Sequence, residues 1–314
     1  MSARRVTVRL RGACDNACAF CAQHGAPALD DLDDVALRDA LTAARAVADE
    51  VTFVGGEPTG HPGLARAVTL ARELGFYRVG VQTHGRALAV DGLASTLAAA
   101  GLTDVHASLH GGPASHDHLV GVEGAHAGLL AGVDAARGAG LTVVATTVLT
   151  RSNFRDLLPV VTELSTRGAA AWCITAPHAA GSALRDFDRV LPRLALAVPF
   201  ALHALEAARR ARLTGWIRGV PLCLLGPFAA RALPDAPRAY GAPCERCGVR
   251  ARCSGVDAMY LARFRGDELS PRASAPDGTS TDHSLARMFV GAGELWRPPE
   301  AAPRRTLPLF SERG

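Results

Sequence analysis

The sequence lacks any apolar run long enough to span a membrane. No stretch of its 314 residues reaches the roughly 18 consecutive apolar residues that such a span needs, and the first residues carry Arg4 and Arg5 rather than an apolar segment. The formal net charge is only +4, with arginine spread among acidic residues, which does not favour a nucleic-acid-binding protein. Aromatic residues make up only 5%, which we attribute to biased base composition. These shortages predict a cytoplasmic protein with no membrane partner.

The chain does have the composition of a folded protein with a large core. Hydrophobic residues make up 48% and charged residues 20%, and the mean hydropathy is +0.13. Its length suffices for one α/β-barrel-sized domain and a small appendage.

Strand-like and helical segments alternate six times between Val6 and Leu213, which predicts parallel strands joined by crossover helices. The pattern fits either a doubly wound sheet or a partial (βα)6 TIM-like barrel. The expected strands are Val6–Arg11, Val51–Gly56, Arg78–Gln82, Thr103–His110, Leu141–Thr147 and Ala170–Thr175, and the expected helices are Asp33–Ala48, His61–Leu74, Asp91–Ala100, Ala125–Ala139, Asn153–Arg167 and Ala183–Leu213.

Beyond Leu213 the composition changes, because Gly, Pro, Cys and Arg become frequent. We therefore expect the core domain at residues 1–213 and a small cysteine-bearing domain at 214–270. The Pro/Arg-rich tail at 271–314 is expected to be extended, wrapping the surface or disordered.

Eight cysteines make metal binding the main functional signal, because clustered cysteines in a reducing cytosol favour metals over disulfides. Cys14, Cys18 and Cys21 follow the first expected strand. Thiolates this close together can each bind a different iron of one cubane cluster. The fourth iron then has no protein ligand, and a metal needs such an open coordination position to do chemistry. Zinc binding by Cys18 and Cys21, or three unrelated loop cysteines, are the alternatives.

The spacing C-x3-C-x2-C, with Phe20 before the last cysteine, resembles the signature of the radical S-adenosylmethionine (SAM) superfamily. The resemblance implies a catalytic [4Fe–4S] cluster on Cys14, Cys18 and Cys21, with SAM chelated to the open iron and cleaved to a 5'-deoxyadenosyl radical. It also implies the partial barrel rather than the doubly wound sheet, and places Phe20 near the adenine.

A second motif, Gly55-Gly56-Glu57-Pro58, ends the second expected strand. Bare glycine backbone lets a ligand approach, and its carbonyls can accept hydrogen bonds from an ammonium group. The motif resembles the GGEP sequence by which the family holds the amino group of SAM. A tight turn with Glu57 facing solvent is the alternative.

The third strand ends in Thr83-His84-Gly85, which resembles the Ser/Thr-Asn-Gly turn that lies near the ribose of SAM in this family. His84 replaces the asparagine. An imidazole can still donate or accept a hydrogen bond, so Thr83 and His84 are candidate SAM contacts, and a surface turn is the alternative.

On the fourth strand, alternation places His106, Ser108 and His110 on one face, which predicts a ligand site at the strand's carboxyl end. Ser108 and His110 resemble the Ser-x-Asp-Gly turn of peptide-modifying relatives, which implies Ser108 near SAM and His110 near the substrate. Packing or helix capping is the alternative. His116 and His118 are expected in a loop.

Cys173 lies in the sixth strand and shares a face with Thr175. If that face lines the lumen, the thiol could donate a hydrogen atom to a substrate radical, as in some peptide epimerases of this superfamily. A small buried structural residue is the alternative.

The remaining cysteines form C-x2-C-x5-C, with one more upstream, and resemble the SPASM or twitch region of radical SAM maturases. Four cysteines can ligate a second [4Fe–4S] cluster, and a zinc site is the alternative. Asp257 stands where a further cysteine is often found. The candidate ligands are Cys223, Cys244, Cys247 and Cys253.

Taken together, these motifs predict a radical SAM enzyme that abstracts hydrogen from a substrate and receives electrons from a donor such as flavodoxin or ferredoxin. An auxiliary cluster suggests a peptide substrate in ribosomal-peptide maturation, and a small metabolite or nucleoside is the second choice. A zinc-stabilised binding protein and a two-cluster electron carrier are the alternatives from other classes.

Overall fold

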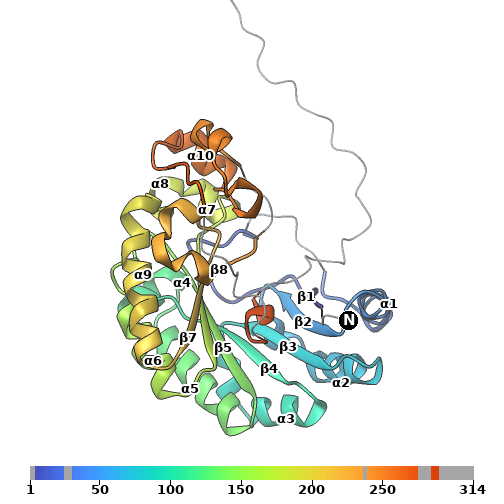
Figure 1. Cartoon of the computed structure of the whole chain (residues 1–314). Coiled ribbons are helices and arrows are strands. Elements are labelled where there is room, and N and C mark those ends of the chain that lie inside the picture. Colours follow the sequence, from blue (N-terminus) through green and yellow to red (C-terminus); the bar gives the residue numbers. More distant parts are fainter. Residues whose placement is uncertain (1–3, 25–29, 236–238, 275–283, 290–314) are drawn as a thin grey trace, which may run out of the picture.

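Eight parallel strands form one curved sheet with helices on its outer face (Figure 1), as seen in a computed structural model that describes residues 4–24, 30–235, 239–274 and 284–289. The strands follow one another in chain order, so β1 and β8 are the two edges of the sheet. The strands are β1 (Arg5–Arg11), β2 (Glu50–Gly55), β3 (Arg78–Thr83), β4 (Asp104–Ser108), β5 (Thr142–Val148), β6 (Ala171–Thr175), β7 (Thr214–Arg218) and β8 (Ala232–Leu233).

The sequential strand order confirms the partial barrel and excludes the doubly wound sheet, in which the order reverses at a switch point. The sheet contains two strands more than the six expected, and it continues past residue 213 because β7 pairs with β6. The expectation missed these strands because β7 has only five residues, between a long helix and a stretch with Gly and Pro, and β8 has only two.

The helices pack small and branched side chains against the sheet. In α1, for example, Leu37, Ala40, Leu41 and Ala44 recur at helical spacing and are buried, and Asp33 caps the first turn by accepting from Ala36 N. The helices are α1 (Asp34–Arg45), α2 (Leu64–Glu73), α3 (Leu93–Ala100), α4 (Pro113–Val120), α5 (Ala125–Gly138), α6 (Leu158–Thr166), α7 (Gly181–Arg185), α8 (Phe187–Val190), α9 (Leu194–Arg210) and α10 (Ala258–Phe264).

The helix α4 corrects one expectation, because it holds His116 and His118, which were expected in a loop. Pro113 occupies the first turn, where its fixed φ favours a helix start, and Gly121 ends the helix in the left-handed region. The helix is too short and too weakly amphipathic to be recognised from its sequence.

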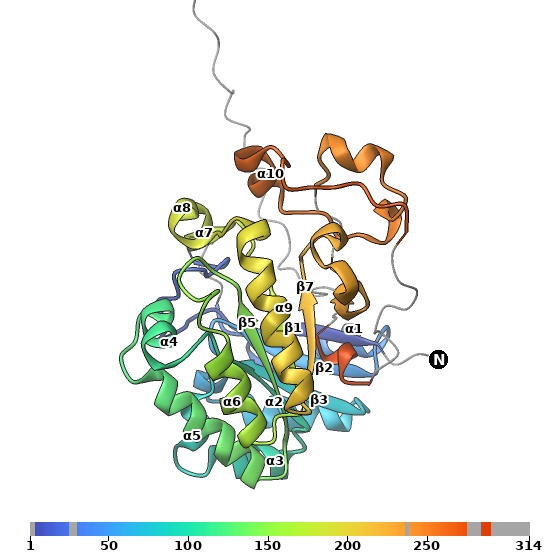
Figure 2. The same ribbon diagram turned by 60° about the vertical axis from the view of Figure 1, so that its left-hand side comes forward.

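Residues 239–274 lie beyond the carboxyl ends of the strands, next to α7 and α8 (Figures 1 and 2). They contain α10 and a single antiparallel bridge between Ala239 and Val256. Most of the expected tail lies outside the described residues. Residues 284–289 differ from the expectation of a surface or disordered segment, because Ala286, Met288 and Phe289 are buried.

The lumen of the sheet contains a buried charged cluster. Arg5 Nε donates to Glu50 Oε2 at 2.9 Å and Arg5 Nη1 to Asp104 Oδ1 at 2.8 Å, and His106 Nε2 lies 2.9 Å from the same Asp104 oxygen. All four residues are at most 5% exposed. A Cβ on Gly80 would lie 2.4 Å from Asp104 Oδ1, so glycine makes room for this cluster.

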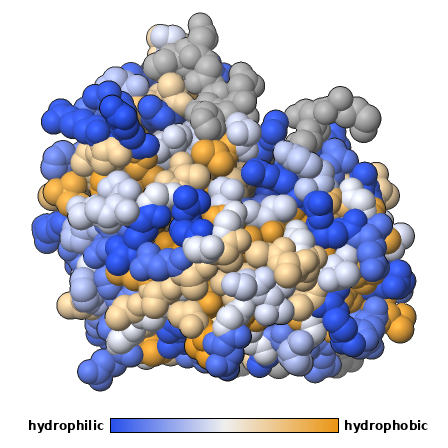
Figure 3. Space-filling model, turned by 90° about the horizontal axis from the view of Figure 1, so that it is seen from below, coloured by the Kyte–Doolittle hydropathy of each residue, from blue (hydrophilic) through white to orange (hydrophobic). Residues whose placement is uncertain are grey.

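Only one stretch among the described residues, Phe187–Arg210, is long and apolar enough to cross a membrane, and half of it is buried inside the fold. This burial is what a core helix shows. Seen from below, hydrophobic and hydrophilic residues are interspersed over the surface (Figure 3). The large exposed apolar side chains, such as Val35 and Tyr77, come from different elements.

Candidate functional site

Cys14, Cys18 and Cys21 lie together in the loop that leaves the carboxyl end of β1. Burial, followed by repulsion from Cys21 and Cys14, raises the pKa of Cys18 to about 12, and burial also raises the pKa of Cys14. The raised pKa values keep these groups as neutral thiols, and a metal that coordinates them would displace their protons; all three cysteines are exposed or half-buried and so open to a ligand. The loop therefore fits an iron–sulfur cluster.

Two helices hold this cysteine loop in place from the far side of the barrel. The N–H groups of Ala17 and Ala19 donate to Val120 O and Leu119 O at the end of α4, both at 2.9 Å. Ser182 N at the start of α7 donates to Cys21 O, also at 2.9 Å. The loop is thus anchored to elements more than 90 residues away in sequence.

The turn after β3 is bound to the cysteine loop through Asp15, in a set of contacts that we call the clasp. His84 Nε2 lies 2.7 Å from Asp15 Oδ1, and Arg86 Nη2 donates to Asp15 Oδ2 and Asn16 Oδ1, both at 2.7 Å. Arg86 N donates to His84 Nδ1, which places the ring hydrogen on Nε2, facing Asp15. Burial raises the pKa of Asp15, but the hydrogen bond from His84 and the charge of Arg86 outweigh it and hold the pKa below its usual range.

Glu57 is a buried hydrogen-bond acceptor and does not face solvent. It is 4% exposed, and it accepts from Thr83 Oγ1 at 2.5 Å, His84 N at 2.8 Å and Thr59 N at 3.1 Å. Pro58 starts the short 3-10 helix that Glu57 caps. The motif after β2 and the turn after β3 are therefore tied into one unit.

The two glycines of this motif are required by packing. A Cβ on Gly55 would lie 2.1 Å from Arg11 O, and one on Gly56 would lie 2.2 Å from Ala13 O. Gly56 N and Glu57 N donate to the same two carbonyls at 2.8 Å. The glycines thus let the motif press against the cysteine loop, and its contact with SAM stays a prediction.

His110 lies beside Phe20, with ring centroids 4.5 Å apart in an edge-on arrangement. The ring Nδ1 of His110 accepts from Val148 N, and the backbone N–H of His110 donates to His116 Nδ1, both at 3.2 Å. Burial lowers the pKa of both histidines, that of His116 to about 4. His110 therefore meets the side chain predicted to lie near the adenine, whereas Ser108 is half-buried on the lumen face of β4.

Cys173 faces the lumen, as its alternation with Thr175 suggested. It is 1% exposed and lies in an apolar cluster with Trp216 and Phe289. Burial raises its pKa to about 12, so the thiol keeps its hydrogen. Its role as a hydrogen donor stays a prediction, and in this structure Phe289 belongs to the cluster that covers it.

The four C-terminal cysteines converge on one small apolar cavity near the surface, lined by Cys223, Cys244, Cys247 and Cys253 together with Tyr240 and Val249. In the described part of the chain, no three His, Cys, Asp or Glu side chains are spaced to hold a single metal ion. Four thiols lining one cavity can serve as ligands of a [4Fe–4S] cluster or of a tetrahedral zinc ion, so the second metal site stays a prediction.

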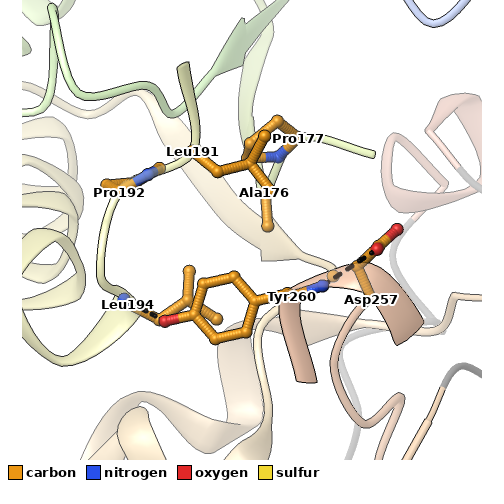
Figure 4. Close-up of a pocket in the computed structure, with 8 residues that line it drawn as sticks. Ala176, Pro177, Leu191, Pro192, Leu194, Asp257 and Tyr260 are labelled. Atoms are coloured by element: carbon orange, nitrogen blue, oxygen red, sulfur yellow. Dashed lines mark hydrogen bonds between the residues drawn. The ribbon is translucent and has the colours of Figure 1, made fainter. Parts of the chain in front are cut away.

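Asp257, which stands where a further cysteine was considered, has a structural role. It caps α10 by accepting from Met259 N at 2.9 Å, and its other oxygen accepts from Ala179 N at 3.2 Å. It lines a pocket between the strand ends and α10, where Tyr260 OH accepts from Leu194 N (Figure 4). Apart from Asp257 and the hydroxyl of Tyr260 the lining side chains are apolar, as expected where two parts of the fold meet.

Sequence reasoning missed the residues that assemble the site. Asp15, Arg86 and Ser182 were not singled out, although Asp15 lies between two of the cysteines and Arg86 closes the turn that contains His84. Their neighbourhood was visible in the sequence. Their partners were not, because each contact joins distant segments.

The sequence profile described as "Radical SAM superfamily" matches residues 9–164. No curated protein matches the chain in sequence.

Solved structures with the same fold include Streptococcus suis SuiB bound to S-adenosylmethionine, with a TM-score of 0.63 and 14% identity over 86% of this chain and 76% of that chain. SuiB bound to the precursor peptide SuiA gives 0.58 and 14% over 71% and 50%. Methylornithine synthase (PylB) gives 0.53 and 12% over 86% and 83%. The chain spans about half the length of the first SuiB chains. At these identities the likeness shows a shared fold.

Proposed function

The chain belongs to the radical SAM superfamily through residues 9–164, and we propose that its catalytic [4Fe–4S] cluster is held by Cys14, Cys18 and Cys21. Membership makes the protein an enzyme of SAM-dependent radical chemistry and implies SAM and a [4Fe–4S] cluster as cofactors. The observation that carries the proposal is the clasp in which Asp15, His84 and Glu57 tie the cysteine loop to the ends of β2 and β3. Three separate motifs thereby form one rigid site.

When bound, the reduced cluster and SAM supply a 5'-deoxyadenosyl radical that abstracts hydrogen from a substrate. The protein's own residues bind and orient. Phe20 and His110 provide an aromatic edge on one side of the cysteine loop, and the motif Gly55–Pro58 presents its backbone on another. Both ring nitrogens of His84 are engaged within the protein, so we assign His84 and Thr83 to positioning the loops first and to SAM contact second.

The test is anaerobic reconstitution with iron and sulfide, followed by reduction in the presence of SAM. We expect 5'-deoxyadenosine from the wild type and none from Cys18→Ser. Cys173→Ala is the matched control, because it removes a cysteine from the lumen rather than from the cysteine loop and should still release 5'-deoxyadenosine. Unchanged cleavage in Cys18→Ser would refute the ligand assignment.

We further propose that the cysteine-bearing region that follows β7 holds an auxiliary [4Fe–4S] cluster on Cys223, Cys244, Cys247 and Cys253, whereas the start of the expected domain at residues 214–270 belongs to the sheet. Their convergence on one cavity supports this assignment. The reconstituted wild type should then hold about eight irons per chain and Cys244→Ser about four. One zinc ion with about four irons in the wild type would instead establish the zinc alternative.

For the substrate we propose a peptide. Support comes from the cysteine-bearing C-terminal domain, and from the fold shared with SuiB, a protein that was solved with its precursor peptide. The test is co-expression with a short peptide encoded beside the gene and a search for a mass change in that peptide. An unchanged peptide, with a mass change instead in a small amino acid or nucleoside, would overturn this choice. We expect a flavodoxin or ferredoxin as electron donor, which a chemical reductant replaces in the assay.

A further inference from the structure

A segment near the carboxyl end of the chain lies inside the lumen of the sheet. Leu285–Phe289 contains the short 3-10 helix Ala286–Met288, seen in red beside the strands in Figures 1 and 2. Ala286 is 0%, Met288 3% and Phe289 7% exposed. Burying these apolar side chains is favourable, so the segment is seated in the lumen as part of the core.

Phe289 lies between β4 and β7 in the lumen. Its ring centroid lies 5.8 Å from that of Trp216 on β7 and 6.2 Å from that of His106 on β4, three strands away. Arg218 Nη1, at the carboxyl end of β7, donates to Phe289 O at 2.7 Å. Aromatic contacts fix the ring, and a charged donor fixes the backbone.

The segment separates two regions of the lumen wall with different chemistry. On the side of β1 to β4 the wall is the charged cluster around Arg5 and Asp104. On the side of β5 to β8 it is mainly apolar, with Arg218 at its carboxyl end, and Leu285–Phe289 packs against it. This covered wall consists of Val144, Ala171, Cys173, Trp216 and Leu233.

We propose that Leu285–Phe289 is the floor of the reaction chamber and that Phe289 determines how deeply a substrate can enter. The inference rests on the proposed function, which places the reacting end of the chamber at the cysteine loop. A substrate then presents a short side chain or small group at the carboxyl ends of the strands. It does not thread through the barrel, and Cys173 lies behind the floor, out of its reach.

The experiment measures the alkylation of Cys173 by iodoacetamide in the full-length, cluster-loaded protein, with the modified peptide quantified by mass spectrometry. We expect protection in the wild type. Phe289→Ala should speed labelling about 100-fold, the factor expected when loss of a buried ring eases local opening. Phe289→Leu, which keeps a branched apolar side chain but a shorter one, should restore most of the protection.

Phe154→Ala is the matched control, because Phe154 is 4% exposed and belongs to the outer core rather than the lumen cluster. It should lower the melting temperature as much as Phe289→Ala does and yet leave Cys173 protected. Equal labelling in the two variants, or rapid labelling of the wild type, would overturn the proposal. The milder Met288→Ala gives the same comparison if Phe289→Ala does not fold.

Labelling needs neither SAM nor substrate, so this result stands apart from the test of the proposed function. If no 5'-deoxyadenosine forms but Cys173 is protected by Phe289, the proposed function fails and the floor remains. Once a substrate is known, Phe289→Leu should change KM for bulkier analogues more than kcat, whereas a purely structural role would change neither selectively.

Discussion

Gly56→Ala tests the closest approach in the site, where the motif after β2 presses on the cysteine loop. A Cβ at this position would lie 2.2 Å from Ala13 O and 2.5 Å from Gly12 O. Both neighbours are backbone atoms, so no side-chain rotation relieves the overlap and one loop must move. Overpacking of this kind costs ~1–3 kcal/mol, whereas a Gly→Ala change without a clash stabilises by ~0.4–1 kcal/mol.

We therefore expect Gly56→Ala to lower the free energy of unfolding by ~1–3 kcal/mol, measured by urea denaturation, and to lower the iron bound after reconstitution. Gly138→Ala is the matched control. Gly138 lies at the end of α5, and nothing would come within 4 Å of its Cβ. That change should stabilise the protein by ~0.5 kcal/mol and leave iron binding unchanged. Wild-type stability and iron content in Gly56→Ala would refute the packing argument.

Three further predictions concern charges. Arg5→Met leaves buried Glu50 and Asp104 without their partner and should lower the free energy of unfolding by ~3–5 kcal/mol; a loss below ~1 kcal/mol in urea titration would contradict this. The pKa of His116, lowered to about 4 chiefly by burial, means that the unfolded chain binds a proton first as pH falls. The free energy of unfolding should therefore decrease by up to ~3 kcal/mol between about pH 6.5 and pH 4, with a shallower decrease in His116→Gln; equal slopes would argue against it. Asp15→Asn weakens the ion pairs of Asp15 with His84 and Arg86, which are partly exposed. It should therefore change the free energy of unfolding by less than ~1 kcal/mol and yet speed the release of iron to a chelator. An unchanged rate of iron release would show that Asp15 does not support the site.

The cysteine loop and its neighbours could be predicted because each motif is local. Three cysteines within eight residues, or two glycines at the end of a strand, carry their chemistry in a few consecutive positions. The alternation of strands and helices likewise predicted the parallel sheet, since apolar periodicity reports which face of each element is buried.

The contacts between motifs could not be predicted in the same way. Glu57 was weighed as a solvent-facing charge, and only the position of β3 beside β2 shows it bonded to Thr83 and His84. The short helix α4 and strand β8 were missed because neither is long enough to show a period. The burial of Phe289 follows from contacts with β4 and β7, at least 70 residues earlier in the chain.

The sequence by itself determined which residue types are available to a metal, through the clustered cysteines, and where adjacent glycines leave the backbone bare. The tertiary structure alone decided which side chains face one another across the lumen, and therefore that Asp15 meets His84 and that Phe289 covers Cys173. The physical reason is that ligand chemistry depends on residue type and short spacing. Burial and pairing, in contrast, depend on the crossover of whole helices, which brings distant strands side by side.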